Sequence, residues 1–363
     1  MTVLGLGLCA CGSGHRSGSA EAGPEVADGG NASEAADESD VLSGEPEVAN
    51  DVASCLAVDA STWDAAHVGD GGALRCAPLG PSGWCRFEPP LGTLELRTVW
   101  SNGPGDVWAG GIEPHLLHFD GAAWTSIEDL ENAVDGVWGS GPNDVWVVGE
   151  FFDQGDGIFH WNGRSWTRTP TPHDGEYGGY MTAVWGGGPD DVWALGQYGI
   201  MHWDGCAWSQ DRSPAMFVGL WSGVWGSGPR DIWATAGGTR LHWDGTAWSD
   251  TLDLGGPFTT GVWGSSPTDV WTSGDVIGHY DGAVWTKAWT PPFGMTTSIW
   301  GSGPRDIWVA GQSIAHYDGT SWSVVQDLGG AMVNHLSGTG ANDVWAVGDA
   351  GEIFHYAGAA PSR

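Results

Sequence analysis

Histidine and aspartate recur at matching places along the chain, and their side chains are the ones best suited to chemistry. Such side chains can hold a metal ion or act as general acid and base. The histidines are His118, His160, His202, His242, His279, His316 and His355. The aspartates, each of which follows a turn sequence, are Asp106, Asp144, Asp191, Asp231, Asp269, Asp306 and Asp343.

A catalytic centre needs unlike groups at one place, whereas these repeated residues occupy equivalent places. We therefore interpret both sets as structural. The aspartates are expected to accept backbone N–H groups of their turns, and the histidines to form hydrogen bonds within or between the repeats. The sequence predicts no catalytic residue, no metal site and no cofactor.

A second group of candidates consists of aromatic and acidic residues outside the repeated pattern. The aromatic candidates are Phe151, Phe152, Tyr177, Tyr180, Phe217, Trp221, Trp289 and Phe293, with Asp153, Asp156 and Asp174 as polar partners. Sugar rings stack on aromatic faces, and protein-binding hot spots use Trp and Tyr. The alternative is that these side chains cover the core beneath long loops. The acidic stretches lack the later Glu of a calcium loop, which favours solvated loops.

The repeated residues belong to one unit that occurs seven times. Residues 137–149 read VWGSGPNDVWVVG and residues 299–311 read IWGSGPRDIWVAG. Each unit contains a V-W-G strand, a G-P-x-D turn, a D-V-W strand, an H-[WFY] strand, a D-G turn and a W-[ST] strand. Pro, Gly and Asp supply the backbone angles of tight hairpins. The unit therefore predicts an all-β fold, a seven-bladed β-propeller with four strands per blade over residues 84–358.

The seventh unit stops after its third strand, near residues 357–358. The segment GWCRF at residues 83–87 resembles the missing fourth strand. We expect this N-terminal strand to complete the last blade, which closes the ring and removes an exposed sheet edge.

Two further sets of tryptophans repeat with the fold, and we expect both to be largely buried. The second-strand set is Trp108, Trp146, Trp193, Trp233, Trp271, Trp308 and Trp345. The fourth-strand set is Trp124, Trp166, Trp208, Trp248, Trp285 and Trp322.

The turn W-D-G-T-A-W at residues 243–248 carries a family resemblance. The repeats resemble bacterial Trp-rich β-propeller proteins related to BNR or Asp-box repeats, whose pattern is S-x-D-x-G-x-x-W. The turn here is one residue shorter between Asp and Trp. The resemblance implies a propeller, and sialidases share that architecture, but the chain has no F-R-I-P motif.

The N-terminal part differs in composition from the repeats. Residues 8–11 read LCAC and resemble a lipobox with Cys11 as the lipid attachment site, so residues 1–11 are interpreted as a truncated lipoprotein-type signal. Residues 12–54 are acidic and poor in aromatic residues, which predicts a disordered tether. Residues 55–83 form a short lead-in. Here Cys76–Cys85 is the first choice for a disulfide, with Cys55 bridging to either as the alternative.

The formal net charge is −33, which disfavours nucleic acid and anionic membrane surfaces as partners. Loops at residues 150–157, 168–183, 209–223 and 286–298 vary on one face of the expected ring, where repeat proteins place recognition. We expect an extracytoplasmic monomer, an outer-membrane lipoprotein or secreted, whose only membrane contact is a lipid anchor. It would bind a glycan or a surface protein through this face. A glycoside hydrolase or lyase, and a scaffold subunit of a cell-surface assembly, are the alternatives.

Overall fold

The computed structural model describes residues 76–87, 92, 94–112, 116–128, 130, 133–150, 157–172, 180–197, 199–211, 221–251 and 258–358. The chain divides into two units, Met1–Asp59 and Ala60–Arg363, and every described residue belongs to the second. Cys11, Cys55 and the segments 1–11 and 12–54 lie outside the described residues. The described part of the chain contains no helix that could span a bilayer.

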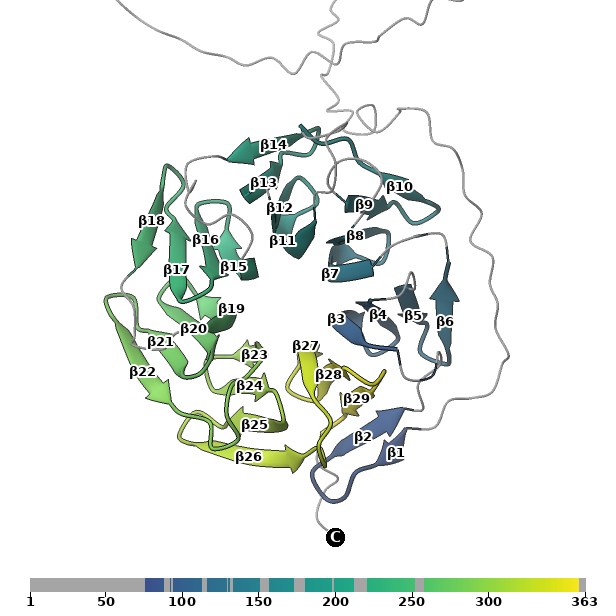
Figure 1. The fold of residues 1–363 in the computed structure, drawn as a ribbon, viewed down its shortest axis with the longest axis vertical. Helices are drawn as coiled ribbons and strands as arrows, with labels where there is room; N and C mark the ends of the chain where they lie inside the picture. Colours follow the sequence, from purple (N-terminus) through teal and green to yellow (C-terminus); the bar gives the residue numbers. More distant parts are fainter. Residues whose placement is uncertain are drawn as a thin grey trace, which may run out of the picture. The chain divides into compact units, whose positions relative to one another are not determined.

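The strands form seven sheets arranged in a ring, and each sheet is one blade (Figure 1). Blade 1 contains β3 (Leu96–Gly103), β4 (Asp106–Gly111), β5 (Leu116–Phe119) and β6 (Trp124–Ile127). Blade 2 contains β7 (Ala133–Gly141), β8 (Asp144–Glu150), β9 (Gly157–Trp161) and β10 (Trp166–Arg168). Blade 3 contains β11 (Met181–Gly188), β12 (Asp191–Gly196), β13 (Gly199–Trp203) and β14 (Trp208–Asp211).

The remaining blades repeat this order. Blade 4 contains β15 (Trp221–Gly228), β16 (Asp231–Ala236), β17 (Thr239–Trp243) and β18 (Trp248–Thr251). Blade 5 contains β19 (Thr259–Ser266), β20 (Asp269–Gly274), β21 (Ile277–Tyr280) and β22 (Trp285–Trp289). Blade 6 contains β23 (Ser298–Gly303), β24 (Asp306–Ala310), β25 (Ser313–Tyr317) and β26 (Trp322–Asp327). Blade 7 contains β27 (Val333–Gly340), β28 (Asp343–Gly348), β29 (Ile353–Tyr356), β2 (Trp84–Phe87) and β1 (Ala77–Pro78).

The N-terminal strand closes the ring, as the sequence predicts. Strand β2 pairs antiparallel with β29, and Trp84 lies opposite Tyr356. The short strand β1 adds a fifth, outermost strand that the sequence analysis did not anticipate. A disulfide joins Cys76, immediately before β1, to Cys85 in β2. The seven-bladed, all-β architecture is therefore confirmed, with one strand more in the last blade.

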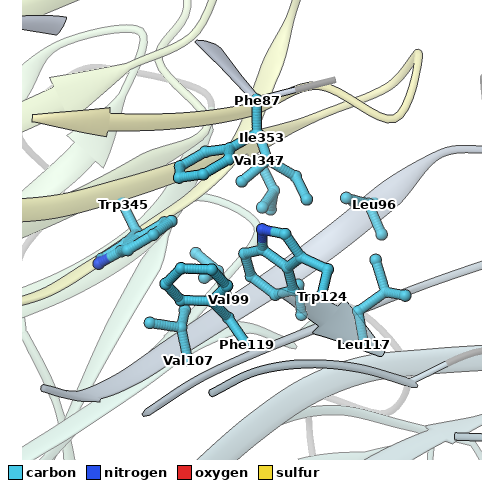
Figure 2. Close-up of a cluster of buried hydrophobic side chains, with 11 residues drawn as sticks. Phe87, Leu96, Val99, Val107, Leu117, Phe119, Trp124, Trp345, Val347 and Ile353 are labelled. Carbon is cyan, nitrogen blue, oxygen red and sulfur yellow. The ribbon is translucent and has the colours of Figure 1, made fainter. Parts of the chain in front are cut away.

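The closure is packed by aromatic side chains from both ends of the chain. Phe87 of β2 stacks on Trp345 of β28, with ring centroids 5.5 Å apart. The edge of Trp345 also meets Trp124 of blade 1. Figure 2 shows these rings converging with Phe119 and the aliphatic side chains around them. The buried cluster therefore joins blade 7 to blade 1 through side chains as well as through strand pairing.

Six of the seven blade junctions use a Trp from one innermost strand and a Gly from the next. The Trp100 ring lies so close to Gly139 that an added Cβ there would be 2.7 Å from Trp100 Cη2. The seventh junction differs, because Ser337 replaces the Trp and Ser101 replaces the Gly. There the Ser101 N–H donates to Ser337 Oγ at 3.3 Å. The two substitutions compensate each other, since a missing Trp removes the need for a Gly.

The repeated tryptophans are buried to different extents. All seven second-strand rings are 1–5% exposed, which confirms the prediction for that set. In the fourth-strand set, Trp124, Trp166 and Trp208 are buried, whereas Trp248, Trp285 and Trp322 are only half-buried. These last three rings still pack against the core clusters at their blade junctions, but they are buried less deeply than the other ten.

Candidate functional site

The repeated Asp, His and Trp form one frame in each blade, at the beginning of its second strand. In blade 4, Asp231 Oδ1 is bonded to His242 Nε2 at 2.6 Å and accepts from Trp233 Nε1 at 3.2 Å. Ser227 Oγ donates to the other carboxylate oxygen at 2.6 Å. The Trp and His rings stack at 4.1 Å. The Asp therefore ties the first three strands of the blade together.

The same Asp–His bond occurs in all seven blades, at 2.5 to 2.9 Å. The expected hydrogen bonding of the histidines is confirmed. The expected role of the aspartates was wrong, because their partners are side chains and not backbone N–H groups. Backbone N–H groups are instead accepted by the Asp of the D-G turn, as when Asp244 Oδ1 accepts from Thr246 and Ala247. Those bonds, with one from the Thr246 hydroxyl, lower the pKa of Asp244 to about 2.

Electrostatics follows from these contacts. Burial alone would raise the pKa of Asp231, but the bonds from His242, Ser227 and Trp233 lower it below the ordinary value. The pKa values of five further frame aspartates are lowered in the same way, and these are Asp106, Asp144, Asp269, Asp306 and Asp343. A carboxylate held ionised by three donors is a structural anchor and a poor proton acceptor. Within the described residues, no group of three or more His, Cys, Asp or Glu is placed to hold a metal ion.

The two faces of the ring differ in their connections. First-to-second connections contain two residues in every blade, and third-to-fourth connections contain four in blades 1 to 6. These lie on one face, which we call the turn face. The other face, the loop face, carries second-to-third connections of two to six residues and links between blades of five to twelve residues. The longest link, residues 169–180, joins blade 2 to blade 3.

Most residues predicted to bind a ligand on the loop face lie outside the described residues: Phe151, Phe152, Asp153, Asp156, Asp174, Tyr177 and Phe217. Tyr180 is half-buried and forms an isolated bridge with Glu150. Trp289 is half-buried and stacks on Trp322 at 5.1 Å, with Phe293 at its edge. Trp221 is 4% exposed in the core of blades 3 and 4, so it presents no ring face to a ligand.

Sequence reasoning missed a set of polar residues around the axial channel. Seven corresponding positions line its loop-face end: Arg97, Asp135, Thr182, Ser222, Thr260, Thr297 and Asn334. Several donate to a backbone carbonyl of the next blade, as Ser222 Oγ does to Thr259 at 2.8 Å. Asn334 Nδ2 donates to Leu96 at 2.9 Å and links blade 7 to blade 1. The signal was a polar, variable residue two positions before the V-W-G motif or its equivalent in each unit.

Blades 1 and 2 place charges in this ring. Arg97 Nη1 donates to Asp135 Oδ1 at 2.7 Å, and Arg97 Nε donates to Glu95 at 3.1 Å. Burial raises the pKa of Asp135, although Arg97 acts in the opposite direction. Nearby, burial lowers the pKa of His335 to about 4, so this imidazole is neutral at pH 7. The channel, about 200 Å³ in volume, is thus lined by groups that already have partners.

A larger groove of about 380 Å³ lies on the rim between blades 1 and 2. It runs from the turns at Gly105 and Asn143 along strand β6 to Glu128. Its walls include the half-buried ring of Trp161 and the buried ring of Trp166. None of its described lining residues is Lys or Arg. The repeat pattern alone did not indicate this groove.

Comparison with known proteins shows the fold. No protein-family model and no curated protein matches the chain. It superposes on YCF48 bound to D1 peptide with a TM-score of 0.61 at 16% identity, over 80% of this chain and 99% of that one. It superposes on virginiamycin B lyase from Staphylococcus aureus with a TM-score of 0.60 at 13% identity, over 75% of this chain and 98% of that one. It superposes on the extracellular domain of the putative hybrid two-component system BT3049 from B. thetaiotaomicron with a TM-score of 0.58 at 14% identity. That match covers 72% of this chain and 40% of the other.

Proposed function

We propose that this chain is an extracytoplasmic binding propeller that recognises a glycan or a surface protein through its loop face. The observation that carries the proposal is the contrast between the two faces. Connections on the turn face keep one length for each type, whereas links on the loop face range from five to twelve residues. Length variation over a constant scaffold is where repeat proteins acquire recognition.

Binding to a partner protein has support from a structural neighbour. YCF48 binds a peptide and has the same ring architecture over 80% of this chain. We also propose that the chain is related to BNR or Asp-box propellers, on the basis of its D-G-x-x-W turns. The loop-face candidates remain Phe151, Phe152, Tyr177 and Tyr180, with the acidic residues between them.

An extracytoplasmic location has two supports. The Cys76–Cys85 disulfide is of a kind that persists in oxidising compartments. One structural neighbour is the extracellular domain of a bacterial protein. We propose that Cys11 carries a lipid anchor and that the head is monomeric. Replacement by C11S should move the protein from the membrane fraction to the soluble fraction, and an unchanged distribution would contradict the anchor.

A binding role is favoured over catalysis by the arrangement of the ionisable groups. The frames place identical Asp–His pairs at seven separate positions instead of unlike groups at one. The only mixed cluster lining the axial channel, around Arg97 and Asp135 in the described residues, is internally paired. The lyase neighbour, at 13% identity, shares the fold alone.

The test is selection of binders by the full chain from a random peptide display library and a printed glycan array. The best binder is then measured by titration calorimetry against two variants. One carries Ala at Phe151, Phe152, Tyr177 and Tyr180. The other carries Ala at exposed turn-face positions, namely Arg230, Thr268, Arg305 and Asn342. We expect only the loop-face variant to lose binding, and loss in the turn-face variant alone would refute the proposal.

A further inference from the structure

The rim groove between blades 1 and 2 opens where a repeated side chain is missing. In the other six blades, the residue before the frame Asp covers the Gly of its own D-G turn or its equivalent, as Arg230 covers Gly245. Blade 1 has Gly105 at this position, and only its backbone meets Gly121. Gly105 has no positive φ, so nothing in its backbone demands glycine. The absent side chain therefore leaves space that the other blades fill.

The groove also contains a buried N–H that lacks a partner. In blades 3 and 4, the fourth-strand Trp donates to a residue on the preceding blade. Trp208 Nε1 donates to Thr169 at 3.0 Å, and Trp248 Nε1 donates to Asp211 at 2.9 Å.

Blade 1 has Ile127 at the position corresponding to Thr169 and Asp211, and an isoleucine side chain accepts no hydrogen bond. Trp166 Nε1 is buried without an acceptor, as is Trp285 Nε1 in blade 5. Trp166 and Ile127 both line the groove. A buried donor without an acceptor destabilises the protein. A ligand oxygen that accepts from it therefore adds more binding free energy than a hydrogen bond at an exposed position would. Ile127 packs in the same cluster, so its side chain must change rotamer to admit that oxygen.

The carboxylates of the lining accept hydrogen bonds, so they favour a ligand that donates. Asp120 and Glu128 are exposed carboxylates that accept hydrogen bonds, and they disfavour an anionic ligand. A purely cationic side chain would satisfy them but could not accept a bond from Trp166. Hydroxyl groups do both, since each donates and accepts. The half-buried Trp161 ring adds an apolar surface of the kind on which the face of a sugar ring stacks.

We propose that this groove binds a neutral sugar residue of an oligosaccharide, with Trp161 beneath the ring and hydroxyls bonded to Trp166, Asp120 and Glu128. A volume of about 380 Å³ accommodates a ligand of this size. The site lies on the rim, includes none of the loop-face candidates among its described lining residues, and does not rest on the proposal made for that face.

The test uses the full chain on an array of neutral, amino and acidic oligosaccharides, followed by calorimetry with the best neutral one. G105N fills the groove with the residue that blades 2 and 7 carry as Asn143 and Asn342. We expect it to weaken binding about tenfold or more, because the added side chain occupies the space of the ring. The matched control is N342G in blade 7, which should bind as the parent does. Equal affinity of G105N and the parent would overturn the proposal.

A second pair of variants examines the unpaired N–H. I127T places in blade 1 the residue that blade 2 has as Thr169, and it should satisfy Trp166 internally. We expect I127T to raise the melting temperature and weaken sugar binding, while I127V does neither. Preference of the chain for acidic or for amino sugars, or silence on every sugar, would refute this site. The proposed function of the loop face is judged separately. If the loop-face variant loses binding to its own partner, that proposal stands even when this sugar site is refuted.

Discussion

The turn face and the loop face use the same strands and obey different constraints. On the turn face, each frame Asp bonds to the His of the neighbouring third strand, and in six of the seven blades it also accepts from the Trp of its own strand. Each connection on this face keeps its length. The loop face lies at the other end of these strands, away from the frame residues, and its links differ in length between blades. The contrast indicates that blade geometry is set from the turn face, which leaves the loop face free to change.

The largest expected effect is on the frame itself. Trp233 is 2% exposed and contacts His242, Tyr280 and Trp285. Replacement by Ala should lower the free energy of unfolding by about 3–5 kcal/mol, as for other large-to-small core changes. Urea denaturation measures this change. Thr268→Ala on an exposed turn should stay within about 0.5 kcal/mol, and a similar loss in both variants would erase the distinction.

Acid should weaken the frames of the turn face once the pH falls below about 4. The frame aspartates have pKa values below their unfolded value, so their contribution is present above about pH 4 and is lost as the pH falls through the folded pKa. The free energy of unfolding should therefore drop steeply below pH 4. Asp231→Asn should reduce stability at pH 7 and make that drop shallower. A stability that stays flat down to pH 3 would contradict the role of the carboxylates.

His335 should add a separate pH dependence at the ring closure. Its pKa is lowered to about 4 by burial, so its contribution is full above the unfolded value near 6.5 and declines as the pH falls toward 4. The loss is about 3 kcal/mol over that window. H335S introduces the residue that blade 6 carries as Ser298, and it should flatten the curve between pH 6.5 and 4. Identical curves for parent and variant would exclude His335 as the cause.

A smaller effect is expected where one frame is incomplete. Ser140, Ser227, Ser265, Ser302 and Thr339 donate to the second carboxylate oxygen of their frame Asp. Blade 3 has Gly187 there, and Asp191 Oδ2 is buried without a partner. Gly187→Ser should raise the free energy of unfolding by about 1 kcal/mol once the carboxylate shifts to admit the side chain. Calorimetric melting tests this, and Gly187→Ala, which adds no donor, should not show the gain.

The sequence predicted the repeated part of this molecule and not the exceptions. Seven Trp-Gly-rich units and a missing last strand were enough to predict the blades and the closure by β2, because each residue recurs with the period of the fold. The partners of the frame aspartates were not predictable from turn chemistry, since they are side chains from the first three strands of each blade.

The candidate sites were harder to foresee. The groove depends on Gly105 and Ile127, two ordinary residues whose effect appears only when seven blades are aligned in space. The channel ring likewise required knowing that Arg97 and Asp135 face each other across a blade junction. The loop-face residues could be chosen because they depart from the repeat, but departure from a repeat does not reveal what they contact.

The most direct test of the account is a comparison of two quadruple variants in one binding experiment. The full chain, its loop-face variant at Phe151, Phe152, Tyr177 and Tyr180, and its turn-face variant at Arg230, Thr268, Arg305 and Asn342 are titrated with the best binder from the peptide and glycan selections. The account predicts that the loop-face variant loses affinity at least about tenfold with an almost unchanged melting temperature, as expected for side chains that contact the ligand and not the core. The turn-face variant should bind as the parent does. Loss of binding in the turn-face variant, with the loop-face variant intact, would contradict the account.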